Sequence, residues 1–163
     1  MQISTIKRGY LVWLIISLCF FNFASVYAKK KLSDKDRQKI EEKFNGIWQM
    51  GYFSGVDKYG EAVYKMLPFW KIFDKENQTF ENWRLDKKTN KLVLNMGGKF
   101  EITSKKEYYE IIDKSAFPDF KKGDDVPLMY KFENHKVLIT SFFLGNRKKL
   151  INEKWIRVKK IEF

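Results

Sequence analysis

From residue 46 onwards the chain consists of short segments in which apolar and polar side chains alternate, separated by residues that favour turns. A period of two is typical of a β-strand with one buried face. The segments predicted as strands are residues 46–53, 67–74, 78–85, 91–96, 99–103, 107–113, 128–133, 136–143 and 152–159. No helix-length apolar period follows Phe44, so the fold class is predicted to be all-β, an antiparallel meander that forms a barrel or a sandwich.

The connectors support this order of strands. Gly97-Gly98 and Asn134-His135 fit two-residue hairpin loops, which favour residues that tolerate positive φ. Residues 86–90 form a longer turn, and the long links are residues 54–66, 114–127 and 145–151. Nine strands cannot close an up-and-down barrel, because the last strand would run parallel to the first. Either one strand is wrongly predicted, and residues 78–85 are the candidate, or the barrel is open or irregular.

A short helix precedes the strands. Ser33 is a suitable N-cap, and Asp34 and Asp36 lie in the first turn, where the helix dipole favours negative charge. Ile40 and Phe44 are four residues apart and share one face, and Asn45-Gly46 ends the helix.

Two short motifs at the ends of the strand region resemble those of the lipocalins and the wider calycins. Gly46-Ile47-Trp48 places a glycine and a tryptophan at the start of the first strand, and Trp155-Ile156-Arg157 places an arginine in the last. The chain looks most like small lipocalin-like proteins exported by bacteria. The resemblance implies a barrel of lipocalin type with a short N-terminal helix, in which Arg157 lies across the indole of Trp48 at the closed end. This pair is expected to keep the fold. The chain departs from many lipocalins in having no disulfide and no helix before its last strand.

The N-terminal segment predicts export. Lys7 and Arg8 precede residues 10–24, which carry no charge, and Val26-Tyr27-Ala28 ends in the small residues that a signal peptidase requires. We therefore interpret residues 1–28 as a cleaved signal peptide and expect a periplasmic or secreted protein. Two alternatives stay open: an uncleaved anchor, and lipidation of Cys19, although Leu18 is larger than the residue a lipobox needs before its cysteine.

Removal of 28 of the 163 residues leaves residues 29–163, enough for one domain. This part has no cysteine, since Cys19 is the only one in the chain, which favours a bacterial envelope. The net charge falls from +12 to +10 because the signal segment contains Lys7 and Arg8.

The sequence gives little sign of catalysis, and we expect no enzyme. His135 is the only histidine and falls in a predicted turn, so neither a zinc site nor a Ser-His-Asp triad is predicted. Asp124-Asp125 lacks the alternating oxygen ligands of a calcium loop. No phosphate-binding or dinucleotide-binding glycine motif is present, so no cofactor is expected. The exported location and the lack of a nucleic-acid module argue against nucleic acid as a partner.

The aromatic content suggests either a filled barrel or a ligand cavity. Small barrels fill themselves with side chains, whereas a cavity would hold a small hydrophobic or amphipathic ligand. Four aromatic residues within strands are candidates for its polar contacts: Tyr52, Trp70, Tyr108 and Tyr130. If the barrel is filled, the protein instead acts as an interaction or scaffolding module of the envelope, using its outer face or its long loops.

The lysines suggest where such a ligand would enter. With nine strands, the connectors that gather at the end opposite the helix are rich in lysine: Lys58, Lys65, Lys87, Lys88, Lys105, Lys106 and Lys136. We interpret this set as a basic rim that attracts amphipathic anions, with residues 54–66 as a mobile lid. The alternative is that these lysines are scattered over the surface and serve solubility.

Overall fold

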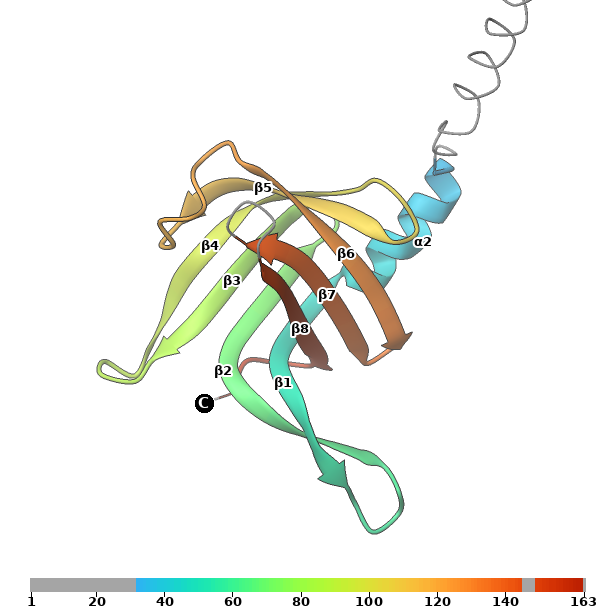
Figure 1. Cartoon of the computed structure of the whole chain (residues 1–163), viewed down its shortest axis with the longest axis vertical. Coiled ribbons are helices and arrows are strands. Elements are labelled where there is room, and N and C mark those ends of the chain that lie inside the picture. The colour runs from blue at the N-terminus through green and yellow to red at the C-terminus, as the bar shows by residue number, and fades with distance from the viewer. Residues whose placement is uncertain (1–31, 145–148, 163) are drawn as a thin grey trace, which may run out of the picture. The chain divides into compact units, whose positions relative to one another are not determined.

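The computed structural model describes residues 32–144 and 149–162, and in them eight antiparallel strands close into a barrel (Figure 1). The strands follow one helix, α2 (Asp34–Phe44), in simple meander order. Their bounds are β1 (Gly46–Val56), β2 (Ala62–Asp74), β3 (Thr79–Asp86), β4 (Lys91–Ile102), β5 (Glu107–Ser115), β6 (Asp125–Asn134), β7 (Val137–Leu144) and β8 (Lys149–Val158). Each strand pairs with its neighbour in sequence, and β1 pairs with β8, so the all-β meander barrel is confirmed.

Helix α2 forms as its sequence predicts. The backbone N–H of Asp36 donates to Oγ of the N-cap Ser33 at 3.2 Å, and Asp34 and Asp36 occupy the first turn. At the other end of the helix, Phe44 is fully buried. Its ring packs against those of Phe73 and Tyr130, at centroid distances of 5.0 and 4.9 Å. Phe44 therefore fills the barrel interior at the end where α2 joins β1.

The predicted count of nine strands is wrong, and the error lies at Gly97-Gly98. Residues 91–96 and 99–103 belong to one strand, β4, and residues 78–85, which had been the candidate for removal, correspond to β3. Gly97 and Gly98 are a bulge in the ladder with β5, and neither has a positive φ. A Cβ atom on Gly98 would lie 1.9 Å from the carbonyl oxygen of Ile111. Glycine is needed here for the close approach of two backbones, as at other bulges, and not for a hairpin turn.

The segment predicted as a mobile lid, residues 54–66, is also different. Most of it is strand: β1 continues to Val56, β2 begins at Ala62, and residues 57–61 form the turn. The resulting β-hairpin extends beyond the rest of the barrel (Figure 1). Its turn is held by Oδ1 of Asp57, which accepts the backbone N–H groups of Tyr59 and Glu61. The segment is thus an ordered extension of the barrel wall. The prediction that residues 54–66 form a long link is wrong.

The predicted signal peptide, residues 1–28 with Cys19, lies outside the described residues, as do residues 145–148 of the last long link. Within the described part of the chain, no helix has both the length and the apolar character needed to cross a membrane.

Candidate functional site

The barrel contains a cavity of about 330 Å³ in the half that lies away from Phe44. Its wall is mostly apolar and includes Met50, Phe69, Trp70, Trp83, Met96, Phe117, Phe120, Val126, Leu128, Phe142, Leu144, Ile151 and Trp155. Phe117 and Phe120 come from the connection between β5 and β6, which lies at the end opposite α2. The interior is therefore not completely filled, and its hollow part is lined by side chains from every strand.

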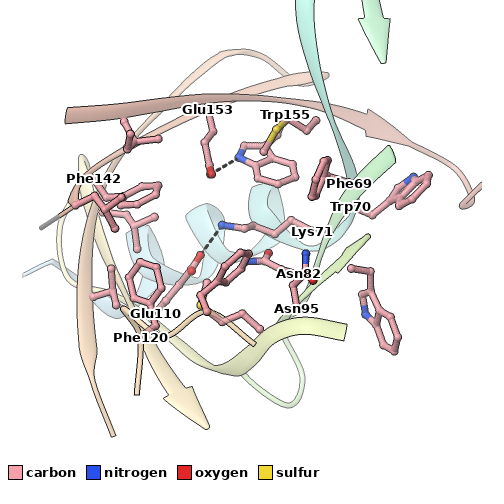
Figure 2. Close-up of a pocket in the computed structure, with 18 of the residues that line it drawn as sticks. Phe69, Trp70, Lys71, Asn82, Asn95, Glu110, Phe120, Phe142, Glu153 and Trp155 are labelled. Carbon is pink, nitrogen blue, oxygen red and sulfur yellow. Dashed lines mark hydrogen bonds and ion pairs between the residues drawn. The ribbon is translucent and has the colours of Figure 1, made fainter. Parts of the chain in front are cut away.

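An ion pair crosses the floor of this cavity (Figure 2). Nζ of Lys71, on β2, lies 2.8 Å from Oε1 of Glu110, on β5, and both side chains are only 2% exposed. The hydroxyl of the buried Tyr108 donates to the same carboxylate oxygen at 2.9 Å. Burial, followed by the charge of Glu110, raises the pKa of Tyr108 well above its usual value, so the phenol stays protonated and can donate. Paired charges with added hydrogen bonds are the form in which ionised groups are tolerated in a protein interior.

A second carboxyl group faces the same space from β8. Oε2 of Glu153 accepts hydrogen bonds from Nε1 of Trp155 at 3.1 Å and from Oγ1 of Thr140 at 3.2 Å. Burial raises the pKa of Glu153, the nearby Lys71 opposes this shift, and Glu110 adds to it. Lys71 also contacts the Trp155 ring, with Nζ 5.0 Å from the ring centroid. Lys71, Glu110 and Glu153 thus form one electrostatic unit with Trp155, which we call the buried charge cluster.

Of the four predicted ligand contacts, the structure places one in the wall of the cavity. Trp70 lines it. Tyr108 lies beneath it and reaches it only through Glu110. Tyr130 packs in the core on the side of α2, where its hydroxyl donates to the carbonyl oxygen of Ser104 and burial raises its pKa to about 12. Tyr52 is 46% exposed on the β1–β2 hairpin and does not line the cavity.

The predicted basic rim is also wrong. Because the structure has one strand where two were predicted around Gly97-Gly98, every later connector lies at the opposite end of the barrel from the end predicted for it. Lys58, Lys87 and Lys88 lie at the end opposite α2, but Lys105 and Lys106 lie at the same end as α2. Nζ of Lys105 is 3.7 Å from Oδ2 of Asp36, which is part of that helix.

Lys136 completes this correction, because it also belongs to the α2 end. Its carbonyl oxygen accepts the backbone N–H of Arg157, next to the start of β1. The seven lysines are therefore divided between the two ends of the barrel, and they form no single rim.

The predicted floor pair is present. Cζ of Arg157 lies 4.2 Å from the centroid of the Trp48 ring, and Trp48 is fully buried. Nη1 and Nη2 of Arg157 donate to the carbonyl oxygens of Asn45 and Lys43, and Nε donates to that of His135. The pair thus ties the last strand to the helix end and to the β6–β7 turn.

Sequence reasoning missed the charged residues of the cavity. Lys71 lies between Phe69 and Phe73 in the alternation of β2, and Glu110 lies between Tyr108 and Ile112 in that of β5. A charge at the centre of an apolar face is the signal that marks them, since such a residue is buried only with a partner. In the described part of the chain, no three His, Cys, Asp or Glu side chains come together as a metal site would require. His135 lies exposed in the β6–β7 connection.

Comparison with known proteins assigns the chain to a family but adds no activity. None of the curated proteins that were compared matches the chain. Residues 43–162 match a protein family, and this range includes β1 to β8 and all residues of the buried charge cluster. The chain therefore belongs to the family described as a domain of unknown function, DUF4488.

Proposed function

We propose that the protein is an exported, non-enzymatic binding protein that holds a small hydrophobic or amphipathic ligand inside its barrel. The observation that carries this proposal is the cavity itself, which combines an apolar wall with a few fixed polar groups. Apolar walls supply most of the affinity for a small ligand, and a few polar groups set its orientation. A volume of about 330 Å³ is near the lower end of the range typical of ligand pockets.

The geometry fits binding better than catalysis. Lys71 and Glu110 are paired with each other, and Glu153 is fixed by Trp155 and Thr140. No Ser, Thr, Cys or His is found among the described residues that line the cavity. The proposal of export depends on the signal-like segment of residues 1–28.

The ligand test is native mass spectrometry of the protein purified from the envelope of its expression host. We expect an added mass that is released on unfolding and identified as a small organic molecule. The matched variant is Val126→Trp, which adds volume on the β6 wall of the cavity. This variant should fold and lose the added mass. The proposal would be contradicted if neither the wild type nor the variant carries an added mass and neither binds a molecule from an extract of small amphiphiles.

A second function, as an interaction module of the envelope, is favoured by the β1–β2 hairpin. Five of its apolar side chains are exposed, and Tyr59 is the most exposed at 77%: Tyr52, Phe53, Val56, Tyr59 and Val63. Exposed apolar residues gathered on one element often mark a protein contact. Cross-linking in envelope extracts, compared between the wild type and Phe53→Ser/Tyr59→Ser, would identify such a partner. A cross-link lost in the double variant supports this function, and an unchanged pattern contradicts it.

A further inference from the structure

We propose that the cavity selects a cationic amphiphile, a protonated amine on an apolar body, and that Glu153 is its counter-ion. This inference rests on the proposed ligand-binding function and names the chemical class of the ligand. The lysine-rich sequence suggested a negatively charged ligand. The inference is the opposite, because the charge of the barrel interior differs in sign from the charge of its surface.

The charges of the cavity wall are unbalanced among the residues that the structure describes. Four of these described lining residues are charged, three acidic and one basic: Glu110, Asp119, Glu153 and Lys71. Lys71 is the partner of Glu110 at 2.8 Å, and both are buried. Within the buried charge cluster, Glu110 and Glu153 therefore share one cation, and the direct contact of Lys71 is with Glu110. A ligand that brings one positive charge would make the cluster neutral, which is the stable arrangement for ionised groups away from water.

The surroundings of Glu153 also suit an ammonium group. One of its oxygens accepts from Trp155 and Thr140, and these two bonds fix the carboxyl against the wall of the cavity. An indole ring beside a carboxylate is a favourable site for an ammonium group, because the ring face attracts the cation and the carboxylate accepts a charge-assisted hydrogen bond. The protein already holds one ammonium in this way, since Nζ of Lys71 contacts both Glu110 and the Trp155 ring (Figure 2).

The described wall of the cavity disfavours a negatively charged ligand. A ligand carboxylate or phosphate would add a negative group beside Glu110 and Glu153, and Lys71, the one cation among the described residues of the wall, is already paired with Glu110. Burial raises the pKa of Glu153, Lys71 opposes this shift and Glu110 adds to it, and a ligand anion beside Glu153 would act in the same direction as Glu110. A neutral alcohol would fit the space but would gain only an ordinary hydrogen bond.

The volume of the cavity determines how large the apolar part of the ligand can be. At about 330 Å³ it has roughly twice the volume of a 150 Å³ cavity that binds benzene. A chain of about eight carbons is of the corresponding size. Octylamine, octanol and octanoate therefore form a matched series that changes the charge of the head group and keeps the body.

Binding is measured by isothermal titration calorimetry and by tryptophan fluorescence at pH 7.5 and 150 mM salt. Trp70, Trp83 and Trp155 line the cavity and serve as reporters. We expect octylamine to bind about tenfold or more tightly than octanol, and octanoate to bind weakest. Octanoate or octanol binding as tightly as octylamine would overturn the amine inference and leave the ligand-binding function intact. Failure of all three probes to bind would count against that function itself.

A variant tests the role of Glu153. Glu153→Gln keeps the size and an acceptor oxygen but removes the charge, so octylamine should lose its advantage while the affinity for octanol stays within about twofold. The control is Glu101→Gln, an exposed residue of β4, which should bind all three probes as the wild type does. An unchanged preference for octylamine in Glu153→Gln would overturn the assignment. The wild-type series decides the charge selectivity even if this variant does not fold.

Discussion

Cζ of Arg157 lies 4.2 Å from the centroid of the Trp48 ring, and the two residues are register partners in the ladder where β8 meets β1. The stacking of Arg157 on Trp48 therefore lies where the first and last strands pair to close the barrel. The guanidinium also donates to the carbonyl oxygens of Lys43 and Asn45, at the end of α2, and of His135, in the β6–β7 turn. Its stabilising effect comes from these bonds together with the cation–π contact.

Replacement of Arg157 by Met should lower the free energy of unfolding by about 2–4 kcal/mol, since it removes several charge-assisted hydrogen bonds and the contact with Trp48. Arg157→Lys should be intermediate, because an ammonium cannot donate in three directions from a planar group. Urea unfolding followed by fluorescence measures both changes. Lys159→Met, an exposed neighbour, is the control, and an equal loss in this variant would contradict the specific role of Arg157.

The buried ion pair gives a second prediction. Lys71→Met leaves Glu110 without its cation, and Glu110→Gln leaves Lys71 without its anion, so each change should cost about 3–5 kcal/mol. The double variant Lys71→Met/Glu110→Gln should be more stable than the sum of the two single changes predicts. Chemical denaturation of all four proteins in a double-mutant cycle gives the coupling energy. Simple additivity would show that the two groups do not depend on each other.

Gly98 should tolerate no side chain. Its Cβ would lie 1.9 Å from the carbonyl oxygen of Ile111, so Gly98→Ala must separate β4 from β5 and should cost about 2–4 kcal/mol. Gly97→Ala is the matched control, because the nearest atom there is 3.3 Å away. Thermal unfolding should show a clearly larger loss for Gly98→Ala. Similar melting temperatures for the two variants would contradict the close approach at the bulge.

The pH dependence of stability should reveal Glu153. Its pKa in the folded protein is raised from the usual 4.5, chiefly by burial, so the folded state holds this proton more tightly than the unfolded state. The contribution of the group is therefore fully present below about pH 4.5 and is lost as the pH rises through the folded pKa. Glu153→Gln, which does not titrate, should gain stability relative to wild type over this range. Urea unfolding from pH 4 to 8 tests this, and a constant difference between the two proteins would contradict it.

The export prediction is tested by the N-terminus of the mature protein. Cleavage after Ala28 should give a chain that begins at Lys29, with the mass of residues 29–163, in the periplasm or medium. Cys19→Ser should leave location and mass unchanged, because Cys19 is then part of the removed segment. Intact-mass analysis of fractionated cells measures both. Retention in the membrane fraction that depends on Cys19 would instead support a lipid anchor.

The alternation of side chains was enough to predict an all-β meander, because it is a local property of sequence. The closed barrel and the pairing of Trp48 with Arg157 were instead implied by the resemblance of the two motifs to those of lipocalins. Gly97-Gly98 was wrongly predicted because a glycine pair suits both a turn with positive φ and a bulge with close backbones. That one error reversed the end of the barrel assigned to every later connector, including the one with Lys105. The charges in the cavity could not be paired from sequence, since Lys71 and Glu110 meet across the barrel from strands that are not neighbours.

The β1–β8 pairing also has a consequence for folding. Trp48 and Arg157 come from the two ends of the barrel domain, so this ladder joins strands that are far apart in the sequence. Contacts of such long sequence separation slow folding, because the entropy of closing the loop is lost before the contact forms. A chain truncated before β8 would expose the edges of β1 and β7, which are free to pair with other chains. C-terminal truncation should therefore cause aggregation rather than a smaller folded barrel.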